Sequence, residues 1–353
     1  MDNEKNTQES VDLAQSLEYA IMSNVLNEFK EVLENDTQKQ RSIALNNIRK
    51  NADNEISLFV KAITISTLDA LNKTSIKVIK DLDKENDLKH YSKNISNWDK
   101  KINKNIRKYV RSKGLVLDGQ KLEKFFYNLC SSEIKAVVDG TDTIDNIVRR
   151  VIKKMSDSGV KIITYENTIR NIDVYVRQEL LYAQKMSAHD IRTQFAKEND
   201  ITIFDIDAHP DARPSHQVWQ GKRYDTTGKY YPTFEEISHG NGSLSDYGCN
   251  HFAYPVTDPN DAPMYTEEML KNINTNPFTF KGKEYDGYKA KQNMRYLERQ
   301  IRALKREKAL LDKNNLTDKK VNAKLRYKQK EYREFCNAYN TYPRTNRTRV
   351  YTE

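Results

Sequence analysis

Proline is absent from the first 209 residues of this 353-residue chain, and the first glycine is Gly114. Proline breaks helix interiors and glycine weakens them, so a stretch almost free of both is compatible with long helices. Seven of the 11 glycines and seven of the eight prolines fall between residues 201 and 290. We therefore expect strands and turns there, with helical regions on either side.

The chain also lacks long apolar runs and closely spaced cysteines. No run approaches the roughly 20 apolar residues of a membrane span, and the opening MDNEKNTQES does not resemble a signal peptide. Cys130, Cys249 and Cys336 lie far apart, which argues against a disulfide framework. We expect a protein made in a reducing cytoplasm, with no membrane contact.

These patterns predict an α+β fold that is mainly α. Apolar residues recur at steps of three and four, as one face of a helix requires, at Ala14, Leu17, Ile21, Val25, Phe29 and Val32. The first ten residues are expected to be disordered. The predicted regions are an N-terminal helical region over 1–113, a second helical region over 114–200, a small irregular β domain over 201–280, and an antiparallel helical hairpin with a tail over 281–353.

The predicted hairpin carries the positive charge of the chain. Residues 281–353 hold 21 Lys and Arg against 9 Asp and Glu, whereas the formal net charge of the whole chain is +9. A local basic surface attracts polyanions such as nucleic acid, although a solvated charged hairpin explains the same composition. The candidate nucleic-acid contacts are Arg295, Arg299, Arg302 and Arg306. Thr317 is the expected N-cap of the second hairpin helix.

Four of the six histidines fall in the predicted β domain, in the stretches AHPDARPSHQVWQG (208–221) and GCNHFAYP (248–255) and, for His239, between them. His209, His216, Cys249 and His251 carry ligand atoms that suit zinc, although the stretches lack the C-x-x-C pairs of strong zinc motifs. A nuclease is a second interpretation, with His209 or His216 as base and His251 beside Asn250 or Asp211 around a divalent ion.

A structural role is the interpretation that we prefer for these stretches. Pro210 and Pro214 are expected to keep HPDARPSH extended and rigid. Asp211 and Arg213 are expected to bond backbone groups or each other. Trp219 would anchor a small core, and Gly221 would permit a tight turn.

The same stretches resemble the phage minor capsid protein 2 family, and more loosely the Mu-type head morphogenesis proteins. The resemblance covers about residues 120–335, and the first 110 residues match no block of it. One departure is Asn250, where the family usually has arginine, so that a cation beside Cys249 is missing. The signature positions here are His209, Asp211, Arg213, Pro214, Ser215, His216, Trp219, Gly221, Lys222, Cys249, His251, Tyr254 and Pro255.

The resemblance implies a structural minor protein of a tailed-phage head, present in few copies near the portal vertex. It implies a multimeric state in the particle, contact with the portal or the major capsid protein, and possible contact with packaged DNA. The protein would reside in the virion, and in the host cytoplasm during assembly. The resemblance implies no established enzyme activity. We expect no cofactor, with zinc at His209, His216, Cys249 and His251 as the alternative.

Overall fold

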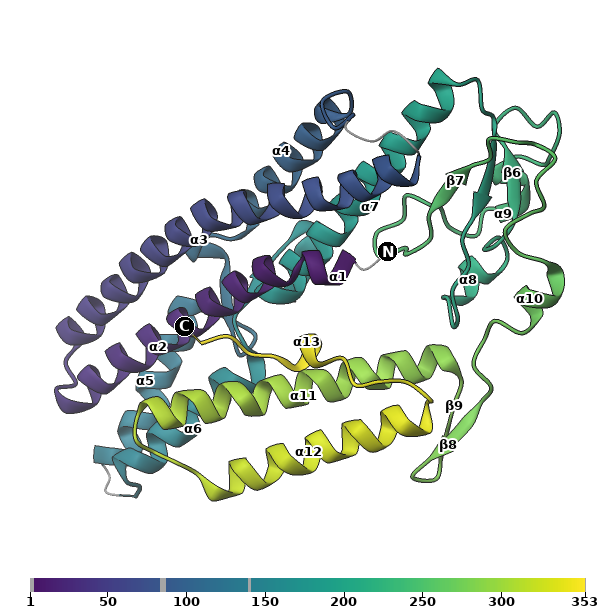
Figure 1. Ribbon diagram of the computed structural model, residues 1–353. Helices are drawn as coiled ribbons and strands as arrows, with labels where there is room; N and C mark the ends of the chain where they lie inside the picture. Colours follow the sequence, from purple (N-terminus) through teal and green to yellow (C-terminus); the bar gives the residue numbers. More distant parts are fainter. Residues whose placement is uncertain (1–2, 83–86, 139–140, 353) are drawn as a thin grey trace.

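The computed structural model describes residues 3–82, 87–138 and 141–352. Figure 1 shows a body of long helices, a small β region at one end and a helical hairpin along one side. The helices are α1 Asn3–Asn6, α2 Gln8–Glu34, α3 Gln38–Asp81, α4 Ser92–Tyr109, α5 Leu122–Val138, α6 Ile144–Ser158, α7 Ile172–Glu198, α8 Pro214–Gln217, α9 Phe234–Ser238, α10 Glu267–Lys271, α11 Gly287–Lys313, α12 Lys319–Ala338 and α13 Thr345–Thr348.

The strands are short and form three antiparallel sheets. The first has the order β2–β1–β3–β4, the second β6–β5–β7, and the third is the β8–β9 pair. The prediction of an α+β fold that is mainly α is confirmed. The strands are β1 Leu115–Leu117, β2 Gln120–Lys121, β3 Lys161–Ile163, β4 Ile169–Asn171, β5 Ile203–Ile206, β6 Arg223–Asp225, β7 Ala253–Pro255, β8 Phe278–Phe280 and β9 Lys283–Tyr285.

The largest core joins α2, α3, α4, α5, α6 and α7. The apolar face predicted from Ala14 to Val32 is buried in it. The expectation of disorder in the first ten residues is wrong beyond Asp2, because α1 and the start of α2 pack against the bundle. Thr7 is buried, and the Ser10 and Ser66 hydroxyls are 2.7 Å apart. No helix in the described parts of the chain combines the length and apolar character needed to cross a bilayer.

The β5–β6–β7 sheet encloses a second, smaller core around Trp219, which is fully buried. Pro214 does not extend the chain as expected. It occupies the first turn of α8, where its missing N–H costs no hydrogen bond and its fixed φ suits a helix. The segment HPDARPSH therefore turns sharply into a short helix. This turn brings His216 against Trp219, with the two rings 4.6 Å apart.

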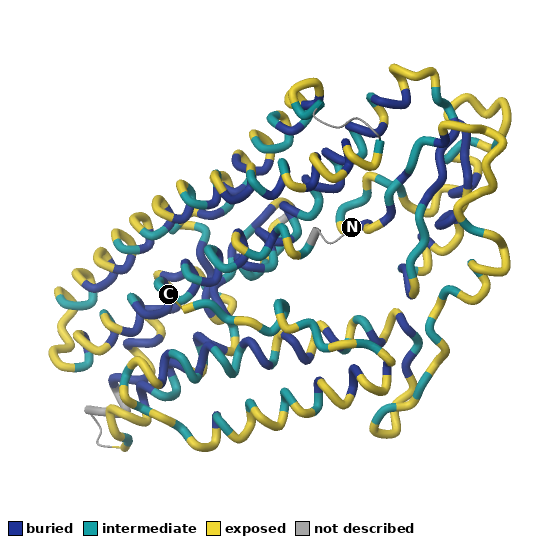
Figure 2. The backbone as a smooth tube through the Cα atoms, in the orientation of Figure 1, coloured by how far each residue is buried: buried dark blue, intermediate teal, exposed yellow. Residues whose placement is uncertain are grey.

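Helices α11 and α12 form the predicted antiparallel hairpin. Leu297 in the first half of α11 shares a core with Phe335 near the end of α12, whereas Leu311 shares the bundle core with Val321. Figure 2 shows that α11 is largely covered while α12 is exposed along much of its length. Asp318, rather than Thr317, is the N-cap of α12, since its carboxylate accepts hydrogen bonds from the Lys320 and Val321 amides.

A buried ionic network fastens α11 to the bundle. The Arg306 guanidinium lies 3.4 Å from the Glu18 carboxylate of α2 and donates two hydrogen bonds to the Ser156 carbonyl of α6, at 2.9 and 3.2 Å. Arg302 lies 3.6 Å from Asp173 of α7. All four charged side chains are buried. A buried charge needs a partner because burial strips its hydration, so these pairs fix how the hairpin docks.

The network corrects the sequence interpretation of the α11 arginines. Arg302 and Arg306 point into the protein interior and are paired there with carboxylates, so neither presents its guanidinium to an external polyanion. Arg295 and Arg299 are exposed on the same helix. The spacing of the arginines along α11 could not show which of them are buried, because both the buried and the exposed face of the helix carry arginine.

Replacing Arg306 with alanine is expected to lower the free energy of unfolding by about 3–5 kcal/mol, because the Glu18 carboxylate is left buried without its partner. Arg299→Ala on the exposed face of α11 serves as the matched control, with an expected change within about 0.5 kcal/mol. Urea denaturation followed by circular dichroism measures both variants. Equal effects of the two substitutions would contradict a buried, paired role for Arg306.

Candidate functional site

The histidine–cysteine cluster, His209, His216, Cys249 and His251, gathers at the β5–β6–β7 sheet. His216 comes from α8, and Cys249 and His251 come from the loop that enters β7. One ligand atom each from His216, Cys249 and His251 lies within 4.8 Å of the others, and all three residues are buried. Three of the four residues singled out in the sequence therefore converge.

His209 takes a different place in the cluster. Its ring stacks on the ring of His251, with centroids 4.3 Å apart, and its Nδ1 lies 3.2 Å from the Pro210 carbonyl oxygen. It does not belong to the set of converging ligand atoms. His209 thus covers His251 on the outer side of the cluster.

Trp219 and Gln220 form the inner wall of the cluster. The Trp219 indole N–H donates to the Asn241 carbonyl at 2.7 Å, and its ring meets His251 edge-on at 4.8 Å. The Gln220 Oε1 accepts the His209 backbone N–H at 3.3 Å and lies 3.1 Å from His251 Nε2. These contacts hold the imidazole of His251 in one orientation.

Burial keeps the histidines of the cluster neutral. It lowers the pKa of His251 to about 2, helped by the nearby His209 and His216, and it lowers the pKa of His209 and His216 as well. Burial also raises the pKa of the Asp207 carboxyl to about 6. Neutral imidazoles keep a lone pair on one nitrogen, which is the form that binds metals.

Lys185 of α7 was not predicted as part of the cluster, although it is buried within hydrogen-bonding reach of Cys249. Its ammonium also donates to the Leu244 carbonyl. Lys185 supplies the cation that Asn250 does not provide. A lysine on the buried face of a helix is the sequence signal that could have identified it.

A cavity of about 720 Å³ lies beside the cluster, between α7, the β domain and the hairpin. Cys249 and His209 line one side of it, and Met294 of α11 and Tyr339 line the other. The cluster therefore sits at the place where the three parts of the chain meet.

Asp211 joins the β domain to the hairpin. It adopts a left-handed conformation with φ of 57°. Its carboxylate accepts hydrogen bonds from the Thr275 amide at 2.9 Å, the Thr275 hydroxyl at 2.8 Å and the Tyr339 hydroxyl at 2.6 Å. Of the two residues that the nuclease interpretation places beside His251, Asn250 or Asp211, these contacts engage the Asp211 carboxylate with Thr275 and Tyr339.

The other signature residues have mixed surroundings. Arg213 donates to the Gly248 carbonyl at 3.1 Å, so it bonds backbone rather than Asp211. Tyr254 lies under the Arg192 guanidinium, 4.2 Å from its ring centre, and Pro255 pairs with Phe204 in the sheet. Gly221 is buried with φ of 69°, where a Cβ would meet Leu270 at 2.4 Å. Exposed positions are Pro214, Ser215 and Lys222.

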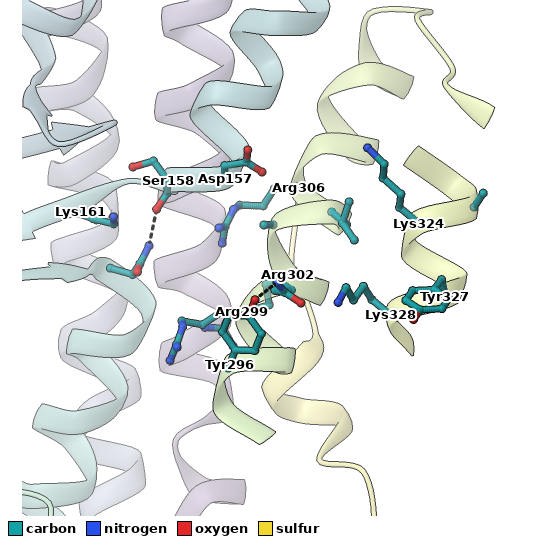
Figure 3. A pocket seen from close by; sticks show the side chains of 15 residues that line it. Asp157, Ser158, Lys161, Tyr296, Arg299, Arg302, Arg306, Lys324, Tyr327 and Lys328 are labelled. Carbon is teal, nitrogen blue, oxygen red and sulfur yellow. Dashed lines mark hydrogen bonds between the residues drawn. The ribbon is translucent and has the colours of Figure 1, made fainter. Parts of the chain in front are cut away.

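A second candidate site is the cationic groove, defined by Lys161, Tyr296, Arg299, Lys324 and Tyr327. It has a volume of about 790 Å³ and runs between the end of α6, strands β3 and β4, and the two hairpin helices. Figure 3 shows Lys161 on the bundle side and Lys324, Tyr327 and Lys328 on α12. Tyr296 is 49% exposed and Tyr327 is 57% exposed.

The charges in the groove differ in availability. Arg302 and Arg306 at its floor belong to the buried network, Asp157 pairs with Lys153 at 2.7 Å, and Lys328 pairs with Glu331 at 2.8 Å. Within the described residues, no carboxylate lies within ion-pairing distance of Lys161, Arg299 or Lys324. Arg299 was predicted from the sequence, but the two lysines were not, because they come from distant segments.

Gly287→Ala tests the joint made by Asp211. A Cβ at Gly287 would lie 1.9 Å from the Asp211 carboxyl carbon, so we expect a loss of about 1–3 kcal/mol in the free energy of unfolding. Gly114→Ala is the control, since the nearest atom to its added Cβ is the Tyr109 carbonyl oxygen at 3.5 Å. Urea denaturation measures both.

A double-mutant cycle identifies the colliding group. In an Asp211→Ala background, Gly287→Ala should cost less, because the carboxylate that the methyl group meets is gone. An undiminished cost in that background would show that Asp211 is not the partner of Gly287.

Comparison with known proteins gives one match. The sequence fits the family model described as phage minor capsid protein 2 over residues 3–337. No curated protein and no solved structure matches it. The match includes the first 110 residues, so the resemblance extends further than the range of about 120–335 inferred from the sequence blocks. Because the model covers nearly the whole chain, the protein belongs to the phage minor capsid protein 2 family and is a structural protein of a phage head.

Proposed function

We propose that this head protein lies near the portal vertex and contacts packaged DNA through the cationic groove. The observation that carries the DNA contact is the set of three cations without carboxylate partners among the described residues, Lys161, Arg299 and Lys324, drawn together from three segments. Unpaired cations gain most from phosphate contact, because no ion pair must first be broken.

The groove suits a phosphate backbone rather than a small metabolite. It is open and lined by long side chains, and the exposed hydroxyls of Tyr296 and Tyr327 can donate to phosphate oxygens. The available cations, Lys161, Arg299 and Lys324, would contact phosphates, which carry no sequence information, so we expect binding without sequence preference. A head protein facing packaged DNA needs no such preference.

The DNA contact predicts a defined salt dependence. The triple variant Lys161→Gln/Arg299→Gln/Lys324→Gln should bind duplex DNA more weakly. For each phosphate that the variant no longer neutralises, the slope of log K against log[salt] should fall by about 0.9. The matched control replaces three exposed lysines of α3, Lys50, Lys61 and Lys77, with glutamine, which removes the same charge. Fluorescence anisotropy over a salt series measures both.

Equal loss of affinity in the two triple variants would mean that net charge alone drives binding. Absence of binding by the wild-type chain at low salt would reject the DNA contact altogether. Neither result would contradict the assignment to the family, because that assignment rests on the sequence match.

The portal contact is supported by an apolar stripe on α3. Ile43, Leu58, Ile65, Leu68 and Ile76 are between 40% and 74% exposed. At 100° per residue they fall within about 80° of arc on the helix, so they lie along one side of it, interleaved with exposed polar residues such as Lys50 and Lys61. An exposed apolar face of this kind marks a protein contact. In a head protein present in few copies, the portal is the partner that we propose, rather than the abundant major capsid protein.

The stripe predicts an assembly defect without a folding defect. Leu58→Ser/Ile65→Ser should keep the wild-type free energy of unfolding within about 0.5 kcal/mol, because both side chains are exposed, yet the protein should be depleted from purified heads. Asp53→Ser/Lys77→Ser, on other faces of α3, is the control. Quantitative mass spectrometry of heads, with electron microscopy of the portal vertex, measures the outcome.

Normal incorporation of the Leu58→Ser/Ile65→Ser variant would remove the stripe as the contact surface. Density for this protein spread over the whole capsid shell, instead of at one vertex, would reject the portal assignment.

A further inference from the structure

We propose that His216, Cys249 and His251 bind one zinc ion, which fastens α8 to the loop that enters β7. The inference is independent of the DNA and portal contacts. Its basis is the convergence of two imidazoles and one thiol, all buried, whose ligand atoms lie within 4.8 Å of one another. His216 and Cys249 are far apart in the sequence, and the sheet beside them has strands of only three or four residues.

The distances match zinc geometry. Cys249 Sγ lies 3.7 Å from His251 Nδ1. Tetrahedral zinc with a thiolate at about 2.3 Å and an imidazole at about 2.0 Å separates the two ligand atoms by about 3.5 Å. The ligand atoms of Cys249 and His251 are therefore close to the separation that the ion requires, and the ligand atom of His216 lies within 4.8 Å of both.

The tautomer of His251 is set for ligation through Nδ1. Gln220 Oε1 can only accept, and it lies 3.1 Å from His251 Nε2, so Nε2 carries the proton and donates it. The same oxygen accepts the His209 amide, which fixes the Gln220 carboxamide orientation. His251 Nδ1 is left with a lone pair facing the sulfur. A metal-ligating histidine typically donates its other ring N–H in this way.

The surroundings of His216 also favour an ion here. His216 Nε2 is buried and forms no hydrogen bond, and its one close carboxylate oxygen among the described residues is Asp246 Oδ2 at 3.5 Å. Gly242 leaves the space beside His216 Nε2 open. A Cβ atom on residue 242 would lie 3.1 Å from His216 Nε2 and 2.8 Å from Asp246 Oδ2. Asp246 itself lies outside the set of converging ligand atoms, and its Oδ2 accepts the Ser243 amide at 3.0 Å.

An ion in this position would act as a staple. The β5–β6–β7 sheet encloses only a small core, and small cores gain much of their stability from metal or disulfide links. The three cysteines are unpaired, so a disulfide does not supply the link. Trp219 and the stacked His209 exclude water from the ligands on two sides.

The test uses the full chain without an affinity tag, purified after expression with added zinc. We expect one zinc per chain by mass spectrometry of metals, and a chelator should lower the melting temperature, because the ion binds the folded state. Replacing zinc with cobalt(II) should give the thiolate-to-metal charge-transfer band and the intense visible bands of a tetrahedral site. The cobalt spectrum needs no variant, so a folding defect cannot obscure it.

Variants locate the ligands. Cys249→Ser and His251→Gln should each reduce the metal content at least tenfold. Cys130→Ala, a buried cysteine in the bundle core, and His239→Asn, an exposed histidine in the same β region, should keep one zinc per chain. A wild-type chain that neither contains zinc nor gives a thiolate–cobalt band would overturn the proposal. Full metal content in Cys249→Ser would do the same.

Discussion

The docking of the C-terminal hairpin depends on charges that are buried away from water. Glu18 and Asp173 face Arg302 and Arg306 across the junction of α2, α6, α7 and α11. Burial alone would raise the pKa of Asp173, but the charges of Arg302, Arg306 and Arg177 hold it below its usual value. Such pairs add little net stability, because desolvation offsets attraction, yet any other docking would leave them unpaired. The network therefore specifies where the hairpin sits.

The same junction brings the two ends of the chain together. Glu18 also accepts the Val160 amide at 2.8 Å, and a Cβ at Gly159 would lie 2.5 Å from its carboxylate, so a glycine must end α6 there. The tail after α12 returns along α2, where the Tyr351 amide donates to Gln15 and the Gln15 amide donates to the Arg349 carbonyl (Figure 1). The N-terminal helices and the hairpin thus fold as one unit.

Periodicity predicted the elements of this fold well, since each helix that buries one face leaves a local signal. The apolar face of α2 and the hairpin of α11 and α12 followed directly from it. The short helix α8 could not be predicted in this way, because four residues are too few to show a period and Pro214 is equally compatible with an extended chain. The predicted N-cap of α12, Thr317, is one residue before the observed N-cap, Asp318. Adjacent Thr and Asp both suit this position, so the sequence does not distinguish them.

The candidate sites were harder to predict because they depend on long-range packing. The histidine–cysteine cluster was identified from residue types. The sequence could not show that His209 stacks on His251 instead of joining the converging ligand atoms. No sequence pattern pointed to Lys161 and Lys324, since they come to line one groove only when the hairpin packs against the bundle.

The division of the α11 arginines has a consequence for the proposed DNA contact. Helix α11 carries Arg295, Arg299, Arg302 and Arg306, and docking withdraws the last two into the network. The cations that remain available in the groove come from β3, α11 and α12, and they face one space only after the hairpin is docked. An isolated hairpin would present its lysines and arginines on all sides and bind DNA without a defined surface. The buried ion pairs thus convert a diffuse basic helix into one oriented groove, which couples the proposed DNA contact to complete folding of the chain.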